Sequence, residues 1–274
     1  MDTNRYFLPD PSWWPIVGSI AILTLASGFI LLLQSIAAGP YLMLIGALIL
    51  MVMLFGWFGT VIRESISGRF NVQVDKSYRW GMVWFIFSEV MFFAALFGAL
   101  FYTRHFSVPW LGDTPILWPN YDANWPTAGP AIKDSFTPMA AWGIPAINTL
   151  VLLSSGATVT WAHWGLMKNN RLQLKVGLAL TILLGAIFLI LQLHEYQSAD
   201  FTIKTGVYGA TFYILTGFHG AHVTLGAIML TAILGRVLAG HFTSNQHFAF
   251  EAVSWYWHFV DVVWLLLFVF VYWL

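Results

Sequence analysis

The chain has 274 residues, of which 59% are hydrophobic and only 9% are charged, and its mean hydropathy is +0.74. A soluble domain of this length cannot bury so much apolar surface, so the composition indicates an integral membrane protein. No cysteine is present, which excludes disulfides, thiolate metal sites and iron–sulfur clusters held by this chain. The net charge is zero and no basic run occurs, so nucleic acid is not expected as a partner.

Seven long apolar runs predict seven transmembrane helices. The expected spans are residues 15–34, 41–63, 79–103, 142–167, 174–196, 205–235 and 248–273. Because lipid forces backbone groups to hydrogen-bond within each span, we expect one all-α membrane domain that covers residues 1–274. The first run is longer than the roughly 7–15 apolar residues of a signal peptide, so it is interpreted as a retained span.

The connections between the spans differ in length and character. The link between the first two spans is short, so these spans are expected to form an antiparallel hairpin. Residues 64–78 are polar and charged and predict a loop. Residues 104–141 form the longest segment outside the spans, with six prolines and three tryptophans. This composition predicts an ordered extramembrane cap or a contact with a partner.

Lysine and arginine are unevenly distributed between the two sides of the predicted bundle. With a cytoplasmic N-terminus, nine of them lie inside and three lie outside. The nine are Arg5, Arg63, Arg69, Lys76, Arg79, Lys168, Arg171, Lys175 and Arg236, and the three are Arg104, Lys133 and Lys204. This bias predicts a cytoplasmic N-terminus and a C-terminus on the opposite side of the membrane.

Five ionisable side chains lie near the middle of apolar spans. At about 1.5 Å per helical residue, Glu89 lies about 15 Å from the inner end of its span. Asp261 and His222 lie about 20 Å from the inner ends of theirs. His219 lies one turn beyond His222, and His258 lies one turn below Asp261 on the same helix face. These positions share one depth band, and ionisable residues at such depth mark a functional site by default.

Two interpretations of this buried polar group stay open. The carboxyl groups fit a proton-exchange site or a functional hydrogen-bonded site. Alternatively, the acids and histidines pair in order to hold helices together. Both interpretations apply to Glu89, whereas a structural pair is favoured for Asp261 with His258. No residue of this chain is predicted to be catalytic.

Histidines three residues apart on one helix, His219 and His222, raise the question of a metal or haem site. A metal needs further ligands, and His258 is the other mid-membrane histidine of the chain. His163 lies near the inner end of its span, and His194 lies near the outer end of its span. Because ligands are scarce at the required depth, we expect no metal or haem to be held by this chain.

Aromatic and basic residues meet at the predicted inner interface. Arg63 and Glu64 close the second span, and Trp57 lies two turns earlier. Arg236 closes the sixth span on the same side. An interfacial arginine with a tryptophan suits a lipid phosphate group. The alternative is simple snorkelling of the arginine to the surface, which is more common in general.

A set of motifs spread along the chain is specific when its members are taken together. They are VIRE at 61–64, SEVMFF at 88–93, NT at 148–149, TVTWAH at 158–163, GFHGAHV at 217–223, HFTSN at 241–245, FEA at 250–252 and WYWHFVDVVW at 255–264. With these motifs the chain resembles subunit III of the haem–copper cytochrome c oxidases, in its bacterial form. The resemblance extends over nearly the whole length.

The resemblance implies seven helices, with the first two separated from the other five by a V-shaped, lipid-filled cleft. It implies that this chain holds no redox centre. Haem and copper would lie in subunits I and II, and cytochrome c would deliver electrons through subunit II. The family's carbodiimide-reactive carboxyl would be Glu89, and lipid headgroups would contact Trp57, Arg63 and Arg236. The location implied is the bacterial inner membrane.

The role implied by the resemblance is one of support. Such a subunit sustains proton uptake by subunit I, protects that subunit from inactivation during turnover, and offers oxygen a route through the lipid cleft. Quinol oxidases have a related subunit that usually has five helices and lacks the first hairpin, so the cytochrome c type is favoured. Residues 69–76 lack the histidine that mitochondrial members often carry there, so proton collection by that loop is not implied.

Two functions from other classes are weighed against this one. A proton-coupled transporter that uses Glu89 and Asp261 would show internal repeats and broken helices, and neither feature is visible in the sequence. A haem-carrying membrane cytochrome would use the histidines of the last two spans. An absorption band from the isolated chain would identify that function.

Overall fold

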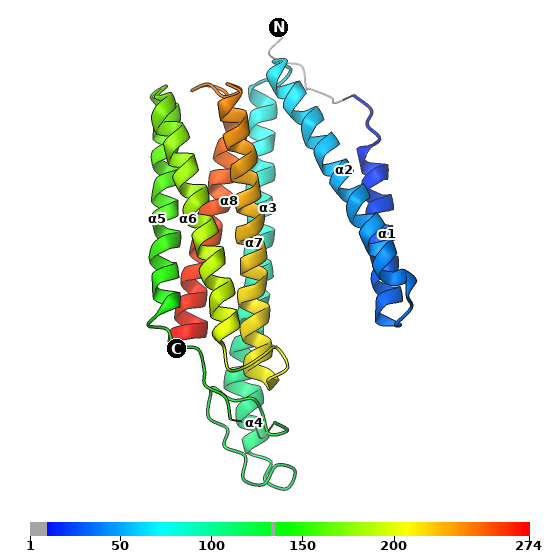
Figure 1. Cartoon of the computed structure of the whole chain (residues 1–274), viewed down its shortest axis with the longest axis vertical. Coiled ribbons are helices and arrows are strands. Elements are labelled where there is room, and N and C mark those ends of the chain that lie inside the picture. Colours follow the sequence, from blue (N-terminus) through cyan, green and yellow to red (C-terminus); the bar gives the residue numbers. More distant parts are fainter. Residues whose placement is uncertain (1–9, 133–134) are drawn as a thin grey trace. The chain divides into compact units, whose positions relative to one another are not determined.

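The computed structural model describes residues 10–132 and 135–274 (Figure 1). Arg5 and Lys133, two of the basic residues in the charge comparison, lie outside the described residues. The chain divides into two compact units, Met1–Tyr78 and Arg79–Leu274. The prediction of a single membrane domain stays a prediction, as does the lipid-filled cleft.

Within the described residues, seven helices are long and apolar enough to cross a membrane, which confirms the predicted all-α membrane fold. The first unit holds α1 (Trp14–Leu33), α2 (Ala38–Ile66) and the first residues of α3 (Val72–Tyr102). The second unit holds the rest of α3, the π-helical segment η1 (Thr103–Ser107), α4 (Val108–Gly112), α5 (Ile144–Met167), α6 (Arg171–Ser198), α7 (Gly206–Leu238), α8 (Phe248–Leu267) and the π-helical segment η2 (Phe268–Trp273).

The helices α1 and α2 form a hairpin whose contact depends on small residues (Figure 1). A Cβ atom added to Gly28 would lie 2.6 Å from the backbone nitrogen of Met43, so glycine allows the two backbones to approach closely. Ser35, in the turn between the helices, has a positive φ of 58°. Pro40 lies in the first turn of α2, where its missing N–H removes no helical hydrogen bond.

The helical run that starts with α3 is longer than the predicted span at both ends. Asn71 caps its start, because the Asn71 side-chain oxygen accepts the backbone N–H of Val74 at 3.0 Å. The helix therefore begins inside the loop predicted over 64–78. At the other end it continues through η1 and α4, so that the run Val72–Gly112 has 41 residues. At 1.5 Å per residue this is about 60 Å, longer than the hydrocarbon core, so the predicted extramembrane segment 104–141 begins as helix.

Large aromatic side chains on α8 organise the second unit. Trp257 is fully buried, and a Cβ added to Gly185 of α6 or Gly226 of α7 would press against its ring. The Trp257 indole N–H donates to the Ser155 hydroxyl of α5 at 2.9 Å. Two turns further along α8, Trp264 donates in the same way to a threonine of α5. Because each ring is buried with its N–H bonded, α8 fixes the positions of the helices around it.

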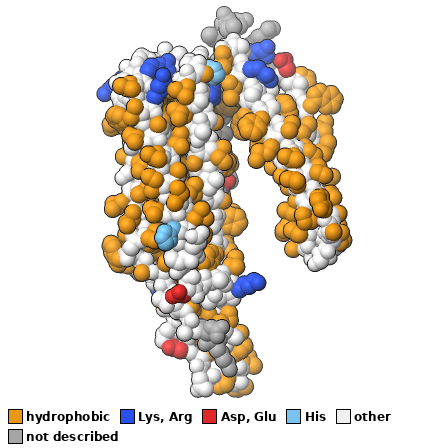
Figure 2. Space-filling model, in the orientation of Figure 1, with side chains coloured by type: hydrophobic (Ala, Val, Ile, Leu, Met, Phe, Trp, Pro, Cys, Tyr) orange, Lys and Arg blue, Asp and Glu red, His pale blue; other side chains and the backbone are white. Residues whose placement is uncertain are grey.

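Apolar side chains cover the helices along most of their length, as Figure 2 shows for one face. Lysine and arginine gather at the end of the second unit where α5 leads into α6. Many large apolar residues are more than half exposed, among them Ile22, Phe55, Trp84, Ile190 and Ile228. This distribution is typical of helices whose outer surface faces lipid.

Candidate functional site

Glu89 on α3 and His222 on α7 form a direct hydrogen-bonded pair. Glu89 Oε2 and His222 Nε2 lie 2.9 Å apart, and the two side chains are 22% and 16% exposed. His222 Nδ1 donates to the carbonyl oxygen of Phe218 at 2.6 Å, because a carbonyl oxygen can only accept. One proton is therefore held between Nε2 and Oε2, in a neutral imidazole–carboxylic acid pair or an imidazolium–carboxylate pair.

Aromatic rings enclose this pair. The rings of Phe92 and Phe93 have centroids 6.0 and 5.0 Å from that of His222, and the Tyr256 ring of α8 lies 6.4 Å away. Phe92 also meets Phe218 of α7 with a centroid distance of 5.0 Å. The helix α3 therefore meets α7 through large aromatic side chains, with the Glu89–His222 bond as a polar link among them. In such surroundings a hydrogen bond is electrostatically stronger than in water.

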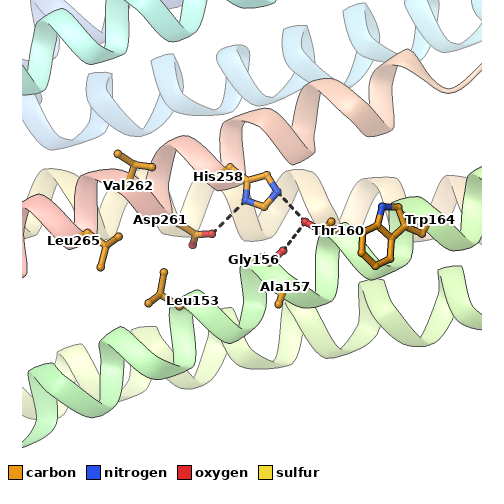
Figure 3. Close-up of a pocket in the computed structure, with 9 residues that line it drawn as sticks. All are labelled: Leu153, Gly156, Ala157, Thr160, Trp164, His258, Asp261, Val262 and Leu265. Carbon is orange, nitrogen blue, oxygen red and sulfur yellow. Dashed lines mark hydrogen bonds and ion pairs between the residues drawn. The ribbon is translucent and has the colours of Figure 1, made fainter.

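Asp261 and His258 of α8 line a hollow of about 500 Å³ beside α5, which Figure 3 shows. His258 Nδ1 lies 3.6 Å from Asp261 Oδ2. His258 Nε2 donates to the Thr160 hydroxyl at 3.2 Å, because that hydroxyl gives its own proton to the Gly156 carbonyl. A Cβ atom at Gly156 would collide with the Asp261 carboxyl, so glycine lets this acid reach the α5 backbone. Asp261 Oδ1 is buried without a hydrogen bond.

His219 on α7 lies in a third place. The ring is fully buried, with centroids 5.7 Å from Phe188 and 5.3 Å from Trp264. Its Nε2 donates to the carbonyl oxygen of Val260 at 3.2 Å, and its Nδ1 is buried without a hydrogen bond. His219 therefore connects α7 to the backbone of α8.

The mid-membrane residues that share a depth band are thus distributed over three places in the second unit. Glu89 is paired with His222, whereas Asp261 is paired with His258. The second pair lies together as its spacing of three residues predicts. The two acids belong to different pairs because they face different helices, which depth alone does not reveal. His219 occupies the third place.

The four residues that are candidates for lipid binding are divided between the two units. On α2, Trp57 and Arg63 are exposed and Glu64 is partly buried. In the last turn of α7, Arg236 is partly buried, and its guanidinium carbon lies 4.5 Å from the centroid of the Phe242 ring. Arg236 Nε is buried without a hydrogen bond. Lipid binding at these four residues stays a prediction.

Glu195 on α6 is a buried acid that sequence position alone does not single out. It lies three residues before the end of its helix, where an acid is expected to be interfacial, yet it is only 1% exposed. The Tyr272 hydroxyl donates to Glu195 Oε1 at 2.7 Å, and Gln192 Nε2 donates to the same hydroxyl oxygen at 3.4 Å. This network attaches η2 to α6.

Four more ionisable side chains, which the sequence interpretation did not place together, meet where α8 begins. Glu251 Oε1 lies 3.2 Å from His247 Nε2 and 3.6 Å from His163 Nε2 of α5. The Glu251 carboxyl also forms an ion pair with Arg79 of α3. His247 and Glu251 are four residues apart at a helix start, which places them on one face. This spacing is the sequence feature that identifies the cluster.

The family model described as cytochrome c oxidase subunit III matches residues 4–274. The chain is 44% identical to the cytochrome c oxidase subunit 3 of Cyprinus carpio over 271 residues, which are 98% of this chain and 97% of the relative. It is 42% identical to that of Oryctolagus cuniculus over 272 residues, which are 99% of this chain and 97% of the relative. These matches confirm the resemblance, and the chain belongs to the cytochrome c oxidase subunit III family.

Proposed function

We propose that this chain is a non-redox core subunit of a proton-translocating cytochrome c oxidase. In this proposal it supports proton uptake and turnover stability of subunit I, which holds haem and copper. Family membership makes the chain a multi-pass membrane subunit of cytochrome c oxidase. Its partners are then subunits I and II, and cytochrome c interacts with it only indirectly, through subunit II.

The observation that carries the proposal is the Glu89–His222 pair. It places a carboxyl group and an imidazole in contact in the middle of two spans, with one proton between them. A carboxyl group and an imidazole in contact can bind or release a proton at a lower free-energy cost than a single ionised side chain in lipid. The cost is lower because the two side chains stay hydrogen-bonded to each other. Glu89 is therefore the proposed proton-related residue of the chain.

The geometry of His222 and His258 supports a non-redox role, whereas His219 Nδ1 is buried without a hydrogen bond. Both ring nitrogens of His222 are used, one toward Phe218 and one toward Glu89. His258 directs Nε2 at Thr160 and Nδ1 toward Asp261. A histidine that ligates haem iron must direct a free nitrogen lone pair at the metal. In this proposal, haem and copper belong to the partner subunits.

The proposal includes a lipid role and a membrane location. Phospholipid would bind at Trp57, Arg63, Glu64 and Arg236, and oxygen would reach subunit I through the implied lipid-filled cleft. The membrane would be the bacterial inner membrane. The excess of lysine and arginine on one side supports a cytoplasmic N-terminus and a periplasmic C-terminus.

A reduced-minus-oxidised visible spectrum of the separated chain tests the non-redox role. The chain would be removed from the purified oxidase with detergent, and both fractions would be measured at matched protein concentrations. We expect the haem bands to stay with the larger subunit and the chain to show none. A haem band that stays with this chain would overturn the proposal and make His219, His222 and His258 the first residues to replace.

A further inference from the structure

We propose that the hollow between α5 and α8 binds a lipid-soluble phenol of the isoprenoid quinol class, with a hydroxyl group of the ligand hydrogen-bonded to Asp261. The hollow has a volume of about 500 Å³ (Figure 3). Its polar lining residues are Thr160, His258 and Asp261, and the other lining residues are apolar or glycine. A concave site with apolar walls and a few polar groups that point into it is typical of small-molecule binding.

The Asp261 carboxyl has unused hydrogen-bonding capacity at this hollow. Its side chain is only 7% exposed, and its Oδ1 atom is buried without a hydrogen bond. Figure 3 shows the carboxyl group between α8 and α5, beside Gly156. A buried polar atom without a partner is unfavourable, because it has lost its hydrogen bonds to water and gained none in exchange. A hydroxyl group in the hollow would supply the missing partner.

His258 provides a second acceptor beside the carboxyl. Because Nε2 donates to the Thr160 hydroxyl, the neutral imidazole ring has its lone pair on Nδ1. Nδ1 lies 3.6 Å from Asp261 Oδ2, which is too long for a hydrogen bond between these two atoms. The His258 side chain is 45% exposed, so a ligand can reach it. With the neutral ring, the site therefore offers acceptors and lacks a donor, which favours a ligand with a hydroxyl group.

The depth and the length of the hollow indicate the kind of ligand. Asp261 lies about 20 Å from the inner end of its span. Phospholipid headgroups stay in the interfacial regions, so the ligand must carry its hydroxyl group into the hydrocarbon core. On α5 the lining residues extend from Leu153 to Trp164, a rise of about 16 Å. An isoprenoid quinol fits both features, because it joins a ring with two hydroxyl groups to a long apolar tail.

Photolabelling of the intact oxidase tests the site. The purified complex that contains this chain would be reconstituted in quinone-free phospholipid nanodiscs and incubated without oxygen with a ubiquinol whose tail carries a diazirine. After illumination, mass spectrometry identifies the labelled peptides, and titration with unlabelled quinol gives the affinity. The quinone form of the probe is the matched ligand control, because it has no hydroxyl group to donate.

Three variants connect the label to the hollow. Asp261→Leu removes the acceptor, and Ala157→Leu fills the hollow from α5 and leaves the carboxyl in place. Thr224→Val is the matched control, because it removes a hydroxyl group from a separate hollow between α6 and α7. If Asp261→Leu does not assemble, Ala157→Leu decides, because the Ala157 side chain is exposed and its replacement leaves the packed interior unchanged.

We expect saturable labelling of the α5 and α8 peptides that line the hollow, and an affinity for the quinol about tenfold higher than for the quinone. Asp261→Leu should weaken quinol binding about tenfold, Ala157→Leu should abolish the label, and Thr224→Val should match the unmodified complex. Equal binding of quinol and quinone, or equal labelling of Ala157→Leu and Thr224→Val, would overturn the proposal. No label on α5 or α8 of the unmodified complex would also overturn it and would indicate that a helix of another subunit covers the hollow.

Discussion

The Glu89 carboxyl of α3 and the His222 imidazole of α7 are joined by a hydrogen bond of 2.9 Å between two membrane spans. The second nitrogen of His222 is held by the carbonyl oxygen of Phe218, one turn earlier on α7. This arrangement fixes the ring orientation and directs Nε2 at the acid. In the proposed function, the proton between the two side chains can pass between Nε2 and Oε2 without a change of rotamer.

Glu89→Gln is expected to leave the oxidase assembled, with near-normal electron transfer. The glutamine amide can keep a hydrogen bond to His222, and in the proposed function Glu89 contacts no redox centre. Oxygen consumption at saturating electron donor, measured on complexes matched for haem content, checks this expectation. Loss of all haem-linked activity in a fully assembled Glu89→Gln complex would contradict it.

Glu89→Leu should behave differently, because it leaves the His222 ring nitrogen without a partner. The expected cost is about 1–3 kcal/mol of stability. In a double-mutant cycle, Glu89→Leu with His222→Leu should cost less than the sum of the two single changes, because neither polar group is left alone. Thermal unfolding of the detergent-solubilised complex measures all three variants. Strict additivity would show that the pair does not couple α3 to α7.

Gly156→Ala is expected to destabilise the contact between α5 and α8. The added methyl group would collide with the Asp261 carboxyl, and overpacking of this kind costs about 1–3 kcal/mol. Gly217→Ala is the matched control, because a Cβ atom there meets nothing within 4 Å. Removing the acid as well, in Gly156→Ala with Asp261→Ala, should recover part of the loss.

Thermal unfolding of the complexes distinguishes these outcomes. The control Gly217→Ala should be neutral or more stable by up to about 1 kcal/mol, because alanine favours helix. If Gly156→Ala proved as stable as the control, the result would contradict a close contact between the Asp261 carboxyl and α5.

Tyr272→Phe is expected to weaken the attachment of η2 to α6. The change removes the hydroxyl that donates to Glu195, and the buried carboxyl loses a bond worth about 1–3 kcal/mol. Tyr41→Phe removes a hydroxyl from a side chain that is mostly exposed, and it should have no such effect. Limited proteolysis near the C-terminus reports the release of η2, and equal cleavage of the two variants would argue against the network.

Arg236→Gln is expected to reduce the phospholipid bound to the complex and to shorten its working life. Arg236 lies at the end of α7 with its guanidinium stacked on Phe242, in a position suited to a lipid phosphate. Lys175→Gln removes an exposed charge near the start of α6 and is the control. Phosphorus per complex and the number of turnovers before inactivation are the measurements. Unchanged values for both quantities would count against a lipid role.

The spans are predictable from the sequence because lipid imposes a minimum apolar length on each of them. Their ends are less predictable, since they depend on local groups. Asn71 caps α3 inside a stretch whose charges indicate a loop, and the helix continues past Arg104 because nothing in η1 interrupts it. Where a helix extends beyond the membrane, its residues can be polar and still helical, so a polar composition does not mark the end of the helix.

The candidate site is only partly predictable, because helix rise gives depth but not the direction in which a side chain points. Glu89 lies at the same depth as several histidines. Which of them it contacts depends on the rotation of each helix about its axis, and in the structure the partner is His222. The proximity of His258 and Asp261 follows from sequence because both lie on one helix. The burial of Glu195 is not predictable from the sequence, because its end of α6 is buried only by the packing of other elements.

Turnover lifetime with and without this chain tests the central claim most directly. The oxidase would be depleted of the chain, reconstituted with it or with buffer, and followed through continuous oxygen reduction until activity is lost. We predict that the depleted enzyme keeps its haem spectrum and its initial electron-transfer rate, takes up protons more slowly, and inactivates after fewer turnovers, and that the added chain restores both properties. Equal proton uptake and equal lifetime in the depleted and restored enzymes would contradict the account.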